Sequence, residues 1–146
     1  MRAASGGTVP DPLPAEIYYH SLSDPSILGP ELRASGAQTL TLFGLHTPHR
    51  LADGRDPEAY RAELVAAAER SLDAVLAEPL ADCLYPDAEG DPCIEAMSPI
   101  DLENKIHLPR GNIFHGDLTW PFAERDEEAG RWGVETEYPN VLLCGS

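Results

Sequence analysis

The chain has 146 residues, 42% of them hydrophobic, and its 25 acidic and 10 basic side chains give a formal net charge of -15 at pH 7. This length is enough for one compact domain that buries about 70% of its unfolded surface, and the negative charge excludes nucleic acid as an expected partner because it repels phosphate backbones. No apolar run approaches the ~20 residues that span a bilayer, and no signal-peptide segment is evident, so we expect a cytoplasmic protein without a membrane span.

The N-terminal part of the sequence predicts a lead-in followed by two short strands. Residues 1–16 contain a Gly-Gly pair and three prolines, so we expect a flexible lead-in without a helix or a central strand. Residues 17–22 are rich in strand-favouring side chains and lead into a turn-forming Ser-Asp-Pro. In residues 37–44, Leu42 and Phe43 point to opposite faces, which predicts a second, half-buried strand.

The longest helix is predicted to begin after Gly54. Asp56 is suited to cap it, and Pro57 suits the first helical position. Pro79 would end the helix. Apolar side chains recur every three or four residues and form one stripe, which consists of Tyr60, Leu64, Ala68, Leu72, Val75 and Leu76.

A second helix is predicted from residue 98, after a less regular stretch. Residues 80–92 have the prolines and acids of a surface loop, and a short strand is expected at Cys93–Ala96. Ser98 and Asp101 then have the spacing of a capping box, and the Pro and Gly of residues 108–112 predict a turn.

The C-terminal part is predicted to be mainly extended. Residues 112–120 are typical of a strand or extended segment, and residues 124–130 of a charged loop. Residues 141–146 (VLLCGS) form an apolar run of strand type. Such a strand is normally followed by a turn and a further element, so we expect that the chain is truncated.

Three sequence blocks together carry a family resemblance. They are SLSDPSILGPEL with QTLTLFGLHTPHRL, SPIDLENKIHLPRGNIFHGDLTW, and EYPNVLLCGS, and they span about residues 18–146. In order and spacing they resemble the C-terminal region of phytoene-desaturase-like FAD-dependent oxidoreductases, in particular the pyridine nucleotide-disulfide oxidoreductase domain-containing proteins. The middle block is the most specific of the three.

The resemblance implies an α+β fold, with an antiparallel sheet and a few helices on the substrate side of the flavoprotein. Residues 17–138 would form this substrate-domain region, and residues 139–146 would begin a strand that returns to the FAD domain. The complete enzyme would remove hydride from a small apolar or amine-like substrate and deliver it to FAD. The dinucleotide-binding domain would lie on the rest of the same polypeptide or on a second chain.

One motif of that family is missing from the sequence. No G-x-G-x-x-G turn occurs, so the pyrophosphate of FAD lacks the helix N-terminus that normally holds it. We therefore expect this chain alone neither to bind FAD tightly nor to catalyse the reaction. Two alternatives stay open: a stand-alone acidic module that binds a protein or a small apolar ligand without redox chemistry, and a truncated reading frame without a separate function.

The candidate site residues lie near the C-terminus. His115 precedes a glycine, and a neutral imidazole there is a candidate to orient substrate or relay a proton, although a structural histidine is the more common case. By the resemblance, Gly145 and Ser146 would lie near the flavin or a phosphate of the cofactor. Trp120 and Trp132 are expected to pack in a core or to line an apolar channel.

No metal site is expected. His46 and His49 are two loop histidines for which solvent exposure is the simpler explanation, and Cys83 and Cys93 are too far apart for a structural zinc pair and are expected to be free thiols. Cys144 is expected to be buried and inert. Asp101 and Glu103 are candidates for an acid/base pair, but residues two apart on a helix do not face each other. Asp101 is therefore assigned to the helix cap.

Overall fold

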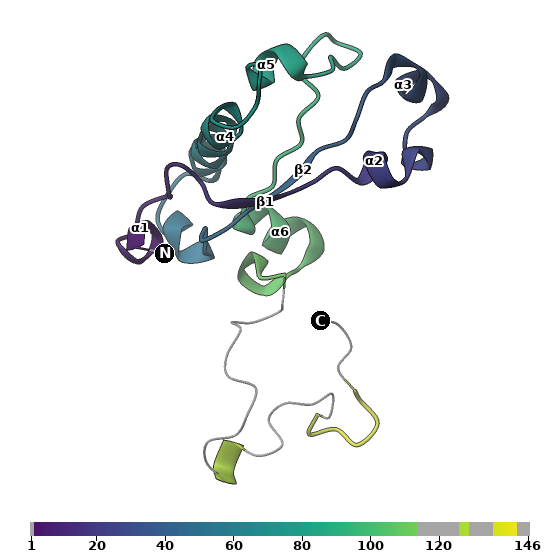
Figure 1. The fold of residues 1–146 in the computed structure, drawn as a ribbon. Helices are drawn as coiled ribbons and strands as arrows, with labels where there is room; N and C mark the ends of the chain where they lie inside the picture. The colour runs from purple at the N-terminus through teal and green to yellow at the C-terminus, as the bar shows by residue number, and fades with distance from the viewer. Residues whose placement is uncertain (1, 114–125, 129–135, 143–146) are drawn as a thin grey trace.

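The computed structural model describes residues 2–113, 126–128 and 136–142. Helices and one two-stranded antiparallel sheet make up this part, and the strands are β1 (Ala15–Tyr18) and β2 (Thr41–Gly44) (Figure 1). The helices are α1 (Arg2–Ser5), α2 (His20–Ser23), α3 (Pro30–Ser35), α4 (Pro57–Asp73), α5 (Leu80–Cys83) and α6 (Pro99–Ile106). Short 3-10 turns are η1 (Pro25–Ile27), η2 (His49–Ala52), η3 (Pro109–Gly111) and η4 (Asp126–Glu128).

Among the helices that the structure describes, none combines the length and the apolar character that a membrane crossing requires.

The first strand is shorter than predicted and begins earlier. It ends at Tyr18, and a helical turn, α2, replaces its expected second half. The reason is a non-local contact: the hydroxyl of the buried Ser21 donates to Gln38 Oε1 at 2.6 Å and accepts from the N–H of Thr39 at 2.8 Å. These bonds hold α2 against the entry to β2, which begins only at Thr41 rather than at residue 37.

The chain between the two strands forms a projecting arm that carries α2, η1 and α3 (Figure 1). Asp24 starts η1, because its carboxylate accepts from both the N–H and the hydroxyl of Ser26. These hydrogen bonds lower the pKa of Asp24. Gly36 ends α3 in the left-handed conformation, with φ of 80°, which a glycine adopts without steric cost.

Helix α4 confirms the predicted start. The carboxylate of Asp56 accepts from the N–H of Ala59 at 2.8 Å, and the helix runs to Asp73. The predicted stripe is correct as far as the buried Leu72, but Val75 is 73% exposed and lies beyond the helix. The carboxylate of Asp73 instead accepts from the N–H of Leu80, where α5 begins.

The core forms where α4 meets η2 and the N-terminal lead-in. The lead-in, expected to be flexible and free of helix, contains the single turn α1 and is fixed to α4 by the N–H of Leu13, which donates to Ser71 Oγ at 2.7 Å. Its prolines rule out a long helix but not apolar contacts, so it contributes directly to the core. The buried core residues are Ala4, Val9, Leu13, Leu51, Ala52, Tyr60 and Ala67.

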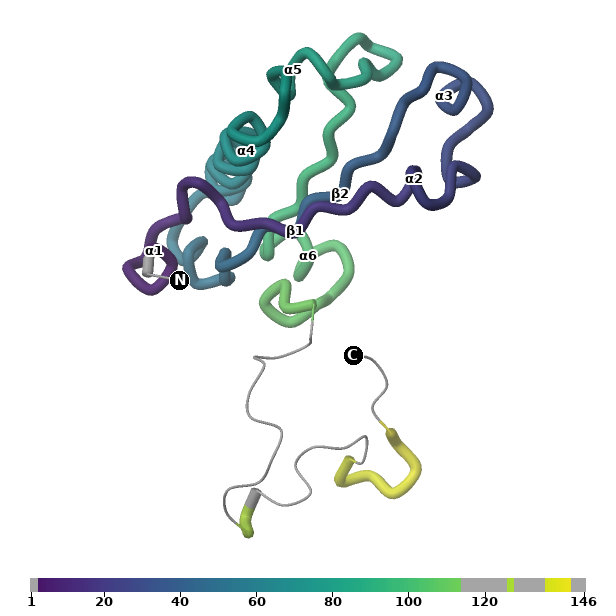
Figure 2. The backbone as a smooth tube through the Cα atoms, in the orientation of Figure 1, coloured from purple at the N-terminus to yellow at the C-terminus, as the bar shows by residue number. Residues whose placement is uncertain are grey.

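The stretch between α5 and α6 is a tight turn followed by an extended segment. The carboxylate of Asp87 accepts from the N–H groups of Glu89 and Asp91. The two sides of the turn pair at one isolated antiparallel β-bridge, between Pro86 and Pro92. The predicted strand at residues 93–96 is wrong, because this segment descends beside α4 without a strand partner (Figure 2).

Helix α6 confirms the predicted capping box. The N–H of Asp101 donates to Ser98 Oγ, and the N–H of Ser98 donates to Asp101 Oδ2 at 2.8 Å. The predicted turn follows as η3, which packs closely against the start of the helix. A Cβ at Gly111 would lie 2.4 Å from the carbonyl oxygen of Pro99, so only glycine fits there.

Candidate functional site

The outer face of the sheet carries a group of exposed aromatic rings. In the register of the two strands Leu42 lies opposite Ile17, while Phe43 lies opposite Glu16. Leu42 packs against the core, so Tyr18 and Phe43 point to the opposite face and are 41% and 45% exposed. Their ring centroids are 5.7 Å apart at an interplanar angle of 80°, an edge-to-face contact between diagonal neighbours.

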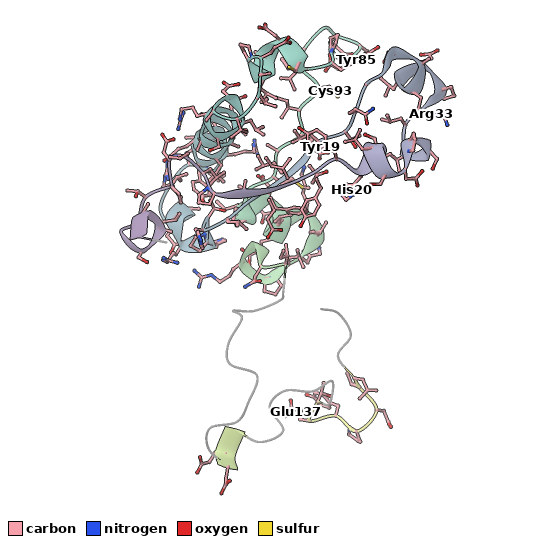
Figure 3. The ribbon with its side chains drawn as sticks, in the orientation of Figure 1. Tyr19, His20, Arg33, Tyr85, Cys93 and Glu137 are labelled. Atoms are coloured by element: carbon pink, nitrogen blue, oxygen red, sulfur yellow. The ribbon has the colours of Figure 1, made fainter. Side chains whose placement is uncertain are left out.

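His20 extends this group from the start of α2. Its ring stacks on Tyr18 with centroids 5.7 Å apart and an interplanar angle of 6°. Figure 3 shows Tyr19 and His20 where the chain passes from β1 into α2. We name Tyr18, His20 and Phe43 the aromatic face.

Glu16 forms a hydrogen bond with Tyr18 of the aromatic face. The hydroxyl of Tyr18 donates to Glu16 Oε2 at 2.7 Å, and this hydrogen bond, the charge of Glu16 and slight burial raise the pKa of Tyr18. Tyr18 is therefore a neutral phenol and not a base at neutral pH. The face offers flat apolar surface beside a carboxylate, an arrangement suited to bind an apolar or cationic group.

A polar cluster joins α6 to α4. Arg61 Nη1 lies 2.8 Å from Asp101 Oδ1, and the side chain of Asp101 is only 15% exposed. Burial raises the pKa of Asp101, but hydrogen bonds from Ser98 and Arg61 and the charge of Arg61 outweigh it, so the net pKa is lowered. Asp101 is thus held ionised, and its role is the helix cap that the sequence predicts.

His49 and Glu103 also have structural partners. His49 Nε2 lies 3.2 Å from Glu103 Oε2, and Nδ1 lies 3.5 Å from Asp53 Oδ1. The expectation of a solvated His49 is wrong, since its side chain is only 21% exposed, whereas His46 is exposed. The two nitrogens face different carboxylates on opposite sides of the ring and do not converge on one cation. In the described part, no group of three or more metal-ligating side chains is found.

A groove lies between α4 and the extended segment that precedes α6, and we name it the α4 groove. It has a volume of about 610 Å³. Its floor is apolar and consists of Ala62, Val65, Ala66, Ile94 and Ala96. The sequence alone does not predict this groove, because its α4 residues lie beside the core stripe and the segment that faces them is 28–34 residues further along the chain.

The described residues do not fit the dinucleotide part of FAD. A pyrophosphate is normally held by free N–H groups at a helix N-terminus. The carboxylate of Asp56 occupies the first turn of α4, and Ser98 and Asp101 occupy that of α6. Both helices therefore present a carboxylate where a phosphate would bind.

Several predicted site residues lie outside the described residues. These are His115, Trp120, Trp132, Cys144, Gly145 and Ser146. The two cysteines within the described part are free thiols, as predicted, and both are exposed. Cys93 lies beside Tyr85 at the base of the tight turn (Figure 3), where its N–H donates to the carbonyl of Tyr85 at 2.9 Å.

Comparison with known proteins links the chain to proteins with an oxidoreductase name. It is 51% identical over 147 residues to uncharacterized proteins of Mycobacterium bovis and Mycobacterium tuberculosis. It is 30% identical over 141 residues to the pyridine nucleotide-disulfide oxidoreductase domain-containing protein 2 of Rattus norvegicus. These alignments cover 98% and 92% of the chain, respectively.

The chain spans about a quarter of the length of these relatives, 27% of the mycobacterial proteins and 22% of the rat protein. No protein-family model and no solved structure matches it. The comparisons therefore support a loose sequence relationship to oxidoreductase-domain proteins.

Proposed function

We propose that this chain forms the substrate-side region of an FAD-dependent, phytoene dehydrogenase-like oxidoreductase. The observation that carries the proposal is its alignment over 92% of its length with a relative that is named for an oxidoreductase domain. The structure supports it in one respect: the β1–β2 sheet packs Leu42 against the core and leaves Tyr18 and Phe43 exposed on the other face. Such a surface suits an apolar substrate.

The proposal separates cofactor binding from substrate binding. FAD, which accepts hydride in such enzymes, would be held by residues outside this chain, on the same polypeptide or on a second one. The aromatic face would contact the substrate. An amine-like substrate gains a further attraction there, because a cation is favoured both by the faces of aromatic rings and by the Glu16 carboxylate.

The proposal can be tested by transplanting the chain into a longer relative. In a chimera, this sequence replaces the matching region of the Mycobacterium tuberculosis protein, to which it is 51% identical. We expect the chimera and its parent to purify with the same flavin content, measured by visible absorbance. A well-folded parent and a well-folded chimera that both lack flavin would contradict the proposal.

The substrate-facing role requires a second measurement. Under anaerobic conditions, a panel of apolar amines and polyenes is screened for bleaching of the flavin in the chimera. We expect Phe43→Ser to retain flavin but to slow bleaching about tenfold or more, because it removes apolar contact with the substrate. The matched control is Ile27→Ser, which removes an apolar side chain that is 52% exposed on the arm and is expected to leave bleaching unchanged. Equal rates in both variants would exclude the aromatic face as the substrate surface.

A further inference from the structure

The α4 groove is a second surface, and the proposed function does not use it. Its floor is formed by five apolar side chains, of which Ile94 is 44% exposed. The floor lies along one side of α4, while the core residues Tyr60 and Ala67 occupy another side of the same helix. The groove is therefore an apolar surface that the core of the described residues does not cover.

The rim of the groove is acidic. It consists of Glu58, Arg61, Glu69 and Glu95. Arg61 contributes no free positive charge, because it is paired with Asp101 at 2.8 Å. Glu58 and Glu69 form no ion pair with any described residue, and Glu95 has only a long contact of 3.9 Å to Lys105. Three carboxylates thus surround an apolar floor.

The positions of these carboxylates set the size of a ligand. Glu58 and Glu69 are eleven residues apart on α4, which corresponds to about 17 Å along a helix axis. The floor residues of α4, which are Ala62, Val65 and Ala66, lie between them along the helix. A helix of about three turns with an apolar stripe and basic residues near both ends would place its apolar side chains on the floor and its cations beside the carboxylates.

We propose that the α4 groove binds a basic amphipathic helix of a separate partner protein. Charge complementarity selects this occupant: the rim is acidic, and the chain as a whole carries a net charge of -15. The same charge disfavours a second copy of the chain. Its own long helix α4 has four acidic and two basic side chains, so it would repel the rim.

The binding test uses the purified chain and two synthetic peptides of about 14 residues, each long enough to cover the groove. One peptide has Leu on one helical face and Lys on the other, and the second has Glu in place of Lys. We expect the Lys peptide to bind one-to-one in a calorimetric titration and the Glu peptide not to bind. Failure of the Lys peptide to bind would overturn the proposal.

Two matched pairs of charge variants distinguish peptide binding in the groove from a general attraction of the peptide to an acidic protein. The double variant Glu58→Gln with Glu69→Gln removes two rim charges, and Glu78→Gln with Glu89→Gln removes two exposed charges elsewhere. We expect the rim variant to weaken binding of the Lys peptide at least fivefold and the control to weaken it less than about twofold. Equal weakening would show attraction to net charge alone and overturn the proposal.

A steric pair of variants provides a test that does not depend on charge. Ala62→Trp fills the groove from an exposed position on its floor, and Ala74→Trp places the same side chain at an exposed position beyond the end of α4. With folding checked by circular dichroism, we expect only Ala62→Trp to abolish binding of the Lys peptide. Unchanged binding by Ala62→Trp, or self-association of the unmodified chain through this surface, would overturn the proposal.

Discussion

Tyr60 combines complete burial with a hydroxyl that has no hydrogen-bond partner among the described residues. Its side chain is 0% exposed, and the guanidinium of Arg55 lies over the ring at 5.0 Å from its centroid. Burial raises the pKa of Tyr60, so the phenol is neutral at physiological pH. The ring thus stabilises the core, while the buried hydroxyl opposes folding.

We predict that Tyr60→Phe leaves the free energy of unfolding unchanged or raises it by up to about 2 kcal/mol, because it removes only the unpaired hydroxyl. Tyr60→Ala should lower it by about 3–5 kcal/mol, because it leaves a cavity. Urea unfolding of the purified chain measures both. Tyr85→Phe, at a residue that is 51% exposed, is the control and should change stability by less than about 0.5 kcal/mol. A clear loss of stability in Tyr60→Phe would show that the hydroxyl has a partner.

The capping box of α6 makes the stability of this helix depend on pH. Asp101 bonds to Ser98 and to Arg61, and these bonds lower its pKa below the ordinary value of 3.8. A carboxyl group whose pKa is lower in the folded state contributes stability above its unfolded pKa. This contribution is lost as the pH falls through the folded pKa.

We therefore predict that Asp101→Asn lowers the free energy of unfolding by about 1–3 kcal/mol at pH 7, because it removes charge-assisted hydrogen bonds. The difference from the unmodified chain should shrink when the pH falls below about 3.8, where Asp101 itself becomes protonated. Chemical unfolding between neutral and acid pH measures this. Asp91→Asn, at an exposed residue whose carboxylate makes no hydrogen bond within the described part, should show no such trend. A difference that does not vary with pH would contradict the assigned role.

The elements that the sequence predicts well are those with local signals. Asp56 precedes α4 and Ser98 precedes α6, and each cap contacts N–H groups within three residues, so the bonding pattern can be inferred from spacing alone. The replacement of the expected strand by α2 has no such signal. It depends on Ser21 and Thr39, which are 18 residues apart.

The same contrast between local signals and non-local contacts applies to the candidate site. The alternation of side chains along β2 predicts that Phe43 and Leu42 point to opposite faces of the sheet, and the structure confirms this. The contact of Phe43 with Tyr18 depends on the pairing of β1 with β2, a register that no local pattern specifies. The contact of His49 with Glu103 likewise joins residues far apart in the sequence, whereas the loop motif alone predicts solvent exposure for His49.

At the scale of the whole molecule, large apolar side chains are more often exposed than buried in the described part of the chain. The buried hydrophobic residues are few and gather around α4. The exposed ones are spread over β1, β2, the arm, the segment between α4 and α6, the end of α6 and residues 138–142. Exposed apolar surface of this extent is typical of a surface that contacts another protein segment or a ligand. The relatives, of which the chain spans about a quarter, contain additional polypeptide that is available for such contacts.

The helix N-termini and the net charge predict how the chain alone behaves toward FAD. Both helices long enough to offer an N-terminal phosphate site, α4 and α6, already have a carboxylate there, and the net charge of -15 adds a general repulsion to the diphosphate of FAD. We predict that the purified chain, incubated with FAD and then separated by gel filtration, shows no flavin absorbance. The chimera with the mycobacterial relative, which supplies the remaining polypeptide, is the positive control. A stable one-to-one yellow complex of the chain alone would contradict the division of cofactor and substrate binding, because it would require a phosphate site within this chain.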